Sequence, residues 1–254
     1  LRIGYCTNVH AGTCLEEVLG NLDRHAAGVR DRLAADPAMR RWTGPMDVGL
    51  WLPVETARRL QTEHPPSFLA EQLAARGLRA FTFNGFPYGD FHRRSVKREV
   101  YRPGWDDPRR LAYTRDLVEI MAQLHGPGAE VGISTVPITW GPWCDEPAWA
   151  RAVANLRLAA AHAADVEVRT GVCVHLDLEP EPGCVLDRPI HLVRLFEDRL
   201  LPRLAPGEEA GVRRHLRACH DACHAAVMFD GQAESMQRLQ AAGIAVGKVQ
   251  VSSA

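Results

Sequence analysis

Apolar and polar residues follow two alternating patterns along the chain, one typical of strands and one typical of helices. Short runs with dense or alternating apolar residues predict seven strands, at residues 2–8, 47–52, 79–84, 130–135, 172–178, 217–221 and 245–251. Longer segments with apolar residues at helical spacing predict helices at residues 13–35, 54–76, 108–124, 147–169, 189–200 and 233–242, the second interrupted at Pro65 and Pro66. Residues 85–105 and 202–209 are expected to be loops.

Regular alternation of strands and helices is typical of βαβ units around a parallel sheet. A barrel is favoured over an open nucleotide-binding sheet because the units are similar in length. In addition, the turn after the first strand, Asn8-Val9-His10-Ala11-Gly12, lacks the glycine spacing of a dinucleotide-binding site. We therefore expect one α/β domain over residues 1–254, a (β/α)8 TIM barrel that lacks its last strand because the sequence stops just after the seventh.

The composition limits the classes of partner and the cellular compartment that we expect for this protein. The 254 residues are 46% hydrophobic and 24% charged, with a net charge of −1, so no overall positive field would recruit nucleic acid. No apolar run approaches the roughly 20 residues that span a bilayer, and no signal peptide is visible, so we expect a cytoplasmic protein. The seven cysteines are odd in number, and Cys219 and Cys223 lack zinc-knuckle spacing, so neither a disulfide framework nor a structural zinc site is predicted.

The fifth predicted strand has polar residues on one side only. One parity carries Val172, Val174, Leu176 and Leu178, and the other carries Cys173, His175, Asp177 and Glu179. Since the apolar parity should face the helices, the polar parity should line the interior of the barrel. Burying ionisable groups is costly unless they are paired or bind a metal, so this strand indicates a site.

Polar residues also end the other predicted strands. Those expected at the carboxyl ends are Asn84, Ser134, Glu179, Asp221 and Gln250, with His224 one turn beyond. In barrel enzymes this end carries the chemistry. Carboxylate and imidazole ligands from neighbouring strands suit Zn²⁺, Mn²⁺ or Mg²⁺, so we expect a divalent metal cofactor here.

Two segments resemble the metal-binding motifs of xylose isomerase-like barrels, a superfamily that includes sugar epimerases and endonuclease IV. They are Leu176-Asp177-Leu178-Glu179-Pro180-Glu181-Pro182-Gly183 and His220-Asp221-Ala222-Cys223-His224-Ala225-Ala226. The resemblance implies Glu179 and Asp221 as metal ligands, and His224 as a ligand or a substrate contact. It also implies a histidine ligand on the seventh strand, where this chain has Gln250, and a second catalytic carboxylate on the eighth strand.

A narrower resemblance is to the metabolite traffic protein EboE family, which is placed in a pathway that moves a small metabolite precursor. The segments that carry it are Gly4-Tyr5-Cys6-Thr7-Asn8-Val9-His10, Phe83-Asn84-Gly85-Phe86-Pro87-Tyr88-Gly89, Val100-Tyr101-Arg102-Pro103 and Gly247-Lys248-Val249-Gln250-Val251-Ser252. They span nearly the whole chain.

The long loop after the third strand is basic and should lie over the barrel mouth. Its arginines Arg93, Arg94 and Arg98 are expected to bind an anionic part of a substrate, together with Asn84, Ser134 and Gln250 at the strand ends, or else to form a solvated surface.

Three functions compete for this pocket. The first is a metal-dependent isomerase or epimerase of a sugar-like or phosphorylated small molecule, with Glu181 or His224 as the catalytic base. The second is a barrel that binds a metabolite without catalysis. The third, an endonuclease IV-like phosphodiesterase, is ranked lowest because the net charge is near zero, so we expect a small-molecule partner and no nucleic acid.

Overall fold

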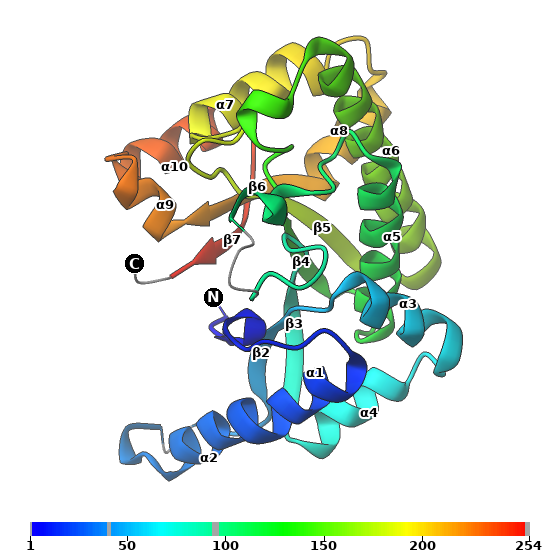
Figure 1. The fold of residues 1–254 in the computed structure, drawn as a ribbon, viewed down its shortest axis with the longest axis vertical. Helices are drawn as coiled ribbons and strands as arrows, with labels where there is room; N and C mark the ends of the chain where they lie inside the picture. The colour runs from blue at the N-terminus through cyan, green and yellow to red at the C-terminus, as the bar shows by residue number, and fades with distance from the viewer. Residues whose placement is uncertain (1, 40–41, 93–96, 252–254) are drawn as a thin grey trace.

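Seven parallel strands form one curled sheet, as the alternating pattern predicts. The computed structural model describes residues 2–39, 42–92 and 97–251. The strands are β1 (Tyr5–Cys6), β2 (Met46–Leu50), β3 (Leu78–Asn84), β4 (Glu130–Thr135), β5 (Cys173–Leu178), β6 (Leu216–Asp221) and β7 (Val246–Gln250), and they pair in chain order from β1 to β7 (Figure 1). Sequential order and parallel pairing give a half-barrel with alternating helices, a TIM barrel without one strand.

The helices follow the strands around the outside of the sheet. They are α1 (Leu15–Asn21), α2 (Ala27–Ala35), α3 (Val54–Glu63), α4 (Phe68–Ala75), α5 (Pro108–Gln123), α6 (Glu146–Thr170), α7 (Pro189–Arg194), α8 (Pro206–His215), α9 (Ala222–Val227) and α10 (Gln232–Ala241). Wider turns at Leu22–Ala26 and Leu195–Leu200 join α1 to α2 and extend α7. The start of α5 is capped: Asp107 accepts a hydrogen bond from the backbone of Arg109, and Pro108 begins the helix.

Two predictions about local structure were wrong. The first strand was expected over residues 2–8, but only Tyr5–Cys6 is extended, and Thr7–Val9 is a 3-10 turn. There Thr7 Oγ1 donates to the Gly49 carbonyl, so a side chain takes over the bonding to β2. Residues 202–209 were expected to be a loop, but α8 begins at Pro206.

The start of α8 explains the second error. Pro206 occupies the first helical position, and Glu208 Oε2 accepts a hydrogen bond from the Ala205 backbone N–H at 2.8 Å. A proline and a carboxylate in these places begin a helix as readily as they form a loop.

The interior of the sheet holds a buried polar pair between two glycines. His175 Nδ1 lies 2.7 Å from Asp177 Oδ1, and both side chains are buried. A methyl group on Gly247 would lie 2.0 Å from Asp177 Oδ1, and one on Gly132 would lie 2.4 Å from Asp177 Oδ2. The glycines of β4 and β7 therefore make room for the polar side of β5, which the sequence pattern places inside.

The two edge strands of the sheet are β1 and β7. On the edge strand β7, Val249 is 53% exposed, and Val251, just after the strand, is 89% exposed. Among the described residues, no helix is long and apolar enough to cross a bilayer.

Candidate metal centre

Two buried carboxylates and an imidazole meet at the carboxyl ends of β5 and β6. Glu179 directly follows β5, Asp221 ends β6, and His224 lies in the first turn of α9. One ligand atom from each falls within 4.8 Å of the others. The structure thus brings together the three residues that were predicted as metal ligands.

Gln250, the last residue of β7, joins the two carboxylates. Its Nε2 donates to Glu179 Oε1 and to Asp221 Oδ2, each at 2.9 Å. This residue was predicted to orient substrate or to replace a histidine ligand. In the structure its amide bridges the two acidic ligands.

Asp221 has a second task at the start of α9. Its Oδ1 accepts hydrogen bonds from the backbone N–H groups of Cys223 at 2.8 Å and His224 at 3.0 Å, which caps the helix. The short helix therefore begins on a metal-ligand candidate and carries His224 back towards it. His224 Nδ1 donates to the Pro180 carbonyl at 2.9 Å, so Nε2 is the nitrogen that could bind a metal.

The electrostatics of the two carboxylates differ. Burial, with the nearby negative charges of Asp221 and Glu181, raises the pKa of Glu179 to about 7, against the opposing charges of Lys248 and His224. Burial also acts to raise the pKa of Asp221, but the hydrogen bond from Gln250, the charge of His224 and the capping N–H groups lower it overall. A cation bound between them would favour the charged form of both carboxylates.

The residues present fit a divalent metal. Glu179 Oε2 and Gln250 Oε1 are buried and have no hydrogen-bond partner among the described residues. A buried carboxylate oxygen without a partner is costly, and a cation would relieve that cost. Two carboxylates and one imidazole are a donor set for Zn²⁺ or Mn²⁺, with coordination positions left for water or substrate.

Glu181, a predicted catalytic residue, lies beside this group. Tyr101 donates its hydroxyl to Glu181 Oε1 at 3.0 Å, and His224 Nε2 lies 4.0 Å from the same oxygen. Burial raises the pKa of Glu181, while His224 and the Tyr101 hydroxyl act against that rise. Both catalytic candidates therefore face each other next to the metal ligands.

A second set of predicted residues is linked by a lysine. Lys248 Nζ donates to Ser134 Oγ at 3.0 Å, and Ser134 Oγ lies 3.5 Å from Asn84 Oδ1. Lys248 was not predicted as a site residue, although it shares the inward parity of Gln250. That parity was the signal available in the sequence.

The basic loop is only partly described. Arg93 and Arg94 lie outside the described residues. Arg98 is exposed, and its guanidinium stacks over the Trp140 ring, 4.5 Å from the centroid. Trp140 in turn stacks on Tyr101, the partner of Glu181, so Arg98 reaches the neighbourhood of the site through two aromatic rings.

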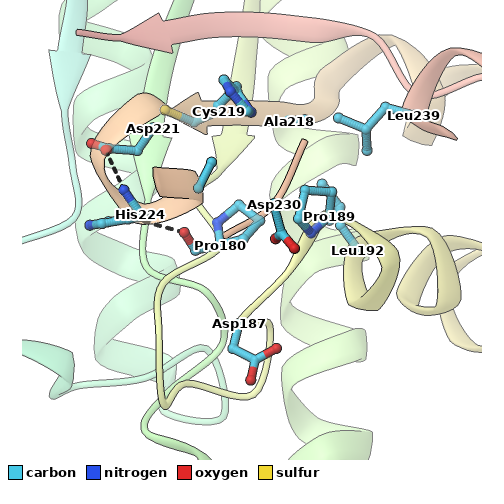
Figure 2. A pocket seen from close by; sticks show the side chains of 12 residues that line it. Pro180, Asp187, Pro189, Leu192, Ala218, Cys219, Asp221, His224, Asp230 and Leu239 are labelled. Carbon is cyan, nitrogen blue, oxygen red and sulfur yellow. Dashed lines mark hydrogen bonds between the residues drawn. The ribbon is translucent and has the colours of Figure 1, made fainter. Parts of the chain in front are cut away.

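A narrow recess lies on one side of Asp221 and His224 (Figure 2). Pro180, Pro189 and Leu239 form part of its wall. His220 also lines the recess, where its Nε2 contacts Gln232 Oε1. It is thus not part of the metal group.

The fold is similar to those of several solved structures. A xylose isomerase domain protein from Alicyclobacillus acidocaldarius is 16% identical, with a TM-score of 0.55, over 97% of this chain and 72% of that one. The IOLI protein with a zinc atom is 13% identical, with a TM-score of 0.52, over 96% and 70%. An L-ribulose 3-epimerase is 16% identical, with a TM-score of 0.53, over 89% and 62%, so this chain spans less than two thirds of its length.

An AP endonuclease of family 2 from Brucella melitensis is also among the similar structures, at 17% identity, with a TM-score of 0.53, over 99% of this chain and 79% of that one. No family model and no curated protein matches the sequence. At these identities the likeness establishes the fold. The chain has the fold of xylose isomerase-like TIM barrels, with seven of the strands present.

Proposed function

We propose that this chain is a metal-dependent protein of the sugar isomerase or epimerase type that acts on a small polar metabolite, such as a sugar or sugar phosphate. The observation that carries the proposal is the meeting of Glu179, Asp221 and His224 at the carboxyl ends of neighbouring strands. Among structures of the same fold, one holds zinc and another is an epimerase, which supports both the cofactor and the reaction class.

In this proposal Glu179, Asp221 and His224 Nε2 hold the metal. When bound, the metal supplies positive charge that polarises a carbonyl or hydroxyl oxygen of the substrate. Glu181, fixed by the Tyr101 hydroxyl, takes or returns the proton of the adjacent carbon. His224 is the alternative candidate for proton transfer, in an arrangement where Glu179 and Asp221 alone hold the metal, because the Nε2 that faces Glu181 cannot bind the metal and move a proton at once.

The other polar groups bind and orient the substrate. Lys248, Ser134 and Asn84 present an ammonium, a hydroxyl and an amide in one connected row, which suits hydroxyl groups of a sugar. Arg98 would contact a phosphate or carboxylate. The same role predicted from the sequence for Arg93 and Arg94 falls on residues outside the described part of the chain. Replacing Arg98 with alanine should lower the affinity for acidic ligands. The loss should be smaller at high salt, because salt screens exposed charges.

The test is exchange of a carbon-bound hydrogen of the substrate with deuterated water. A panel of ketoses and their phosphates would be incubated with the protein and Mn²⁺ or Zn²⁺. We expect exchange that needs the metal and is lost in Glu181→Gln and in His224→Ala. The matched control is Glu99→Gln, which changes an exposed glutamate and should leave exchange unchanged.

The alternative is a barrel that binds a metabolite without catalysis. It is favoured if a ligand binds tightly and shows no exchange with any metal. The resemblance to the EboE family adds the expectation that the metabolite belongs to a traffic pathway. A metabolite recovered with the purified protein and identified by mass spectrometry would test that expectation.

A further inference from the structure

A second group of metal-binding side chains lies far along the strands from the first. Glu167 belongs to the last turns of α6, Cys173 begins β5, and His215 ends α8. One ligand atom from each lies within 4.8 Å of the others. Cys173 and His215 are only 3% and 1% exposed. Since Cys173 and Glu179 lie at opposite ends of β5, this group is separate from the candidate metal centre.

The orientation of the His215 ring points to a cation. Its Nδ1 lies 2.8 Å from the Val174 carbonyl oxygen, which can only accept, so Nδ1 carries a proton. The other nitrogen, Nε2, lies 3.3 Å from Glu167 Oε2. In the neutral ring this places a lone pair against a carboxylate oxygen, which is unfavourable unless a proton or a metal ion lies between them.

The spacing of these atoms matches a tetrahedral metal. Zinc binds imidazole nitrogen and carboxylate oxygen at about 2.0–2.2 Å, so the two ligand atoms are about 3.3–3.5 Å apart at a tetrahedral angle. The observed distance between His215 Nε2 and Glu167 Oε2 is 3.3 Å. The Cys173 sulfur lies within 4.8 Å of a ring nitrogen of His215 and a carboxylate oxygen of Glu167, and it supplies the soft ligand that selects zinc over magnesium or calcium.

Two arginines hold the ligands in place. Arg214 Nε donates to Glu167 Oε2 at 2.7 Å, which fixes the carboxylate while leaving that oxygen a second lone pair. Arg217 Nη2 lies 4.0 Å from Cys173 Sγ. Burial and the charge of Glu167 raise the pKa of the Cys173 thiol overall, while the positive charges of Arg214 and Arg217 act towards the thiolate, the form of cysteine that binds metal. Outer-shell partners of this kind orient metal ligands.

We propose that Glu167, Cys173 and His215 form a second zinc site, which ties the end of α6 to the start of β5 and the end of α8. A water molecule would complete the tetrahedron. The site is structural and does not depend on the function proposed for the first centre. It was not foreseen from the cysteine spacing, because its ligands come from three elements that only the fold brings together.

The test uses Co²⁺ as a probe for zinc, because a thiolate bound to Co²⁺ gives a charge-transfer band in the near ultraviolet. The first centre has no cysteine among its ligands, so the band reports the second site. We expect the band in the wild-type protein, its loss in Cys173→Ser, and bleaching by Zn²⁺. Cys219→Ser and Cys223→Ser, which change cysteines near the first centre, are the controls and should keep the band.

A second variant tests the imidazole. In His215→Asn the side-chain amide can still donate to Val174 in place of Nδ1, but no atom replaces Nε2, so Co²⁺ affinity should fall at least about tenfold while the protein stays folded by circular dichroism. A wild-type protein without the band, or a band that survives in Cys173→Ser, overturns the proposal. Either result would leave His215 and Glu167 as an ion pair only.

Discussion

Gln250 Nε2 lies 2.9 Å from Glu179 Oε1 and 2.9 Å from Asp221 Oδ2, so one amide joins the carboxylates of two neighbouring strands. The N–H groups of the Gln250 amide donate to the carboxylate oxygens that a metal would also bind. The amide can turn over, and its Oε1 would then face the metal as a ligand. The side chain of Gln250 therefore affects how tightly this centre binds a cation.

Replacing Gln250 with histidine should tighten metal binding. The change removes the two competing N–H donors and adds an imidazole lone pair, so we expect roughly tenfold higher Zn²⁺ affinity by calorimetry. Gln250→Leu is the control, because it removes the donors without adding a ligand, and it should stay within a few-fold of wild type. Equal gains in both variants would mean that the imidazole does not bind the metal.

Asp221 allows its two roles to be separated. Asp221→Asn keeps an oxygen that can cap α9 but loses the charge, so metal-dependent stabilisation should disappear with little change in the stability of the metal-free protein. Asp221→Ala loses the cap as well, so its free energy of unfolding in urea, measured without metal, should fall by about a further 0.5–2 kcal/mol. If both variants unfold alike without metal, the cap contributes nothing.

Gly247 is expected to be intolerant of a side chain. A methyl group there would meet Asp177 Oδ1 at 2.0 Å and the His175 ring at 2.6 Å, both in the packed interior, so Gly247→Ala should destabilise the protein by about 1–3 kcal/mol. Gly20→Ala is the matched control. No atom lies within 4 Å of its methyl position, and alanine in α1 should stabilise by roughly 0.5–1 kcal/mol.

Much of the fold could be predicted because periodicity reports it directly. The bounds of β4 match the prediction, and the inward parity of β5 placed Glu179 correctly. Parity also linked Gln250 to the same interior. The start of α8 was missed because proline and glutamate begin helices and loops alike, and only the bond from Ala205 N–H to Glu208 decides between them.

The parts of the sites that could not be predicted depend on contacts distant in sequence. Tyr101 reaches Glu181 across 80 positions of the chain, and no local pattern marks that approach. The group of Glu167, Cys173 and His215 likewise forms only where α6, β5 and α8 meet. Periodicity indicates on which face of its own helix or strand a residue lies, but not which residue of another element it contacts.

Acid should weaken the protein through a half-buried histidine away from both metal groups. Burial lowers the pKa of His125 below its ordinary value of 6.5, and the positive charges of Arg2 and Arg79 add to this, against Asp47 and a backbone bond to Ala80. The unfolded chain then binds the proton more strongly than the folded one. The contribution of His125 is therefore fully present above pH 6.5 and is lost as the pH falls through the lower folded pKa.

Urea unfolding between about pH 8 and pH 5 would measure this loss. His125→Asn, which removes the titrating ring, should flatten the decline below pH 6.5 relative to wild type. His162→Asn should act in the same direction, because burial lowers the pKa of His162 too, although Glu119 opposes the shift. The carboxylate of Asp47, whose pKa is lowered by Arg2 and Arg79 despite its burial, titrates only at lower pH. Glu179, whose pKa burial raises to about 7, titrates inside this window in wild type and variants alike, so the difference between each variant and wild type reports the histidine. A decline of unchanged steepness in both variants would show that neither histidine is held neutral by the fold.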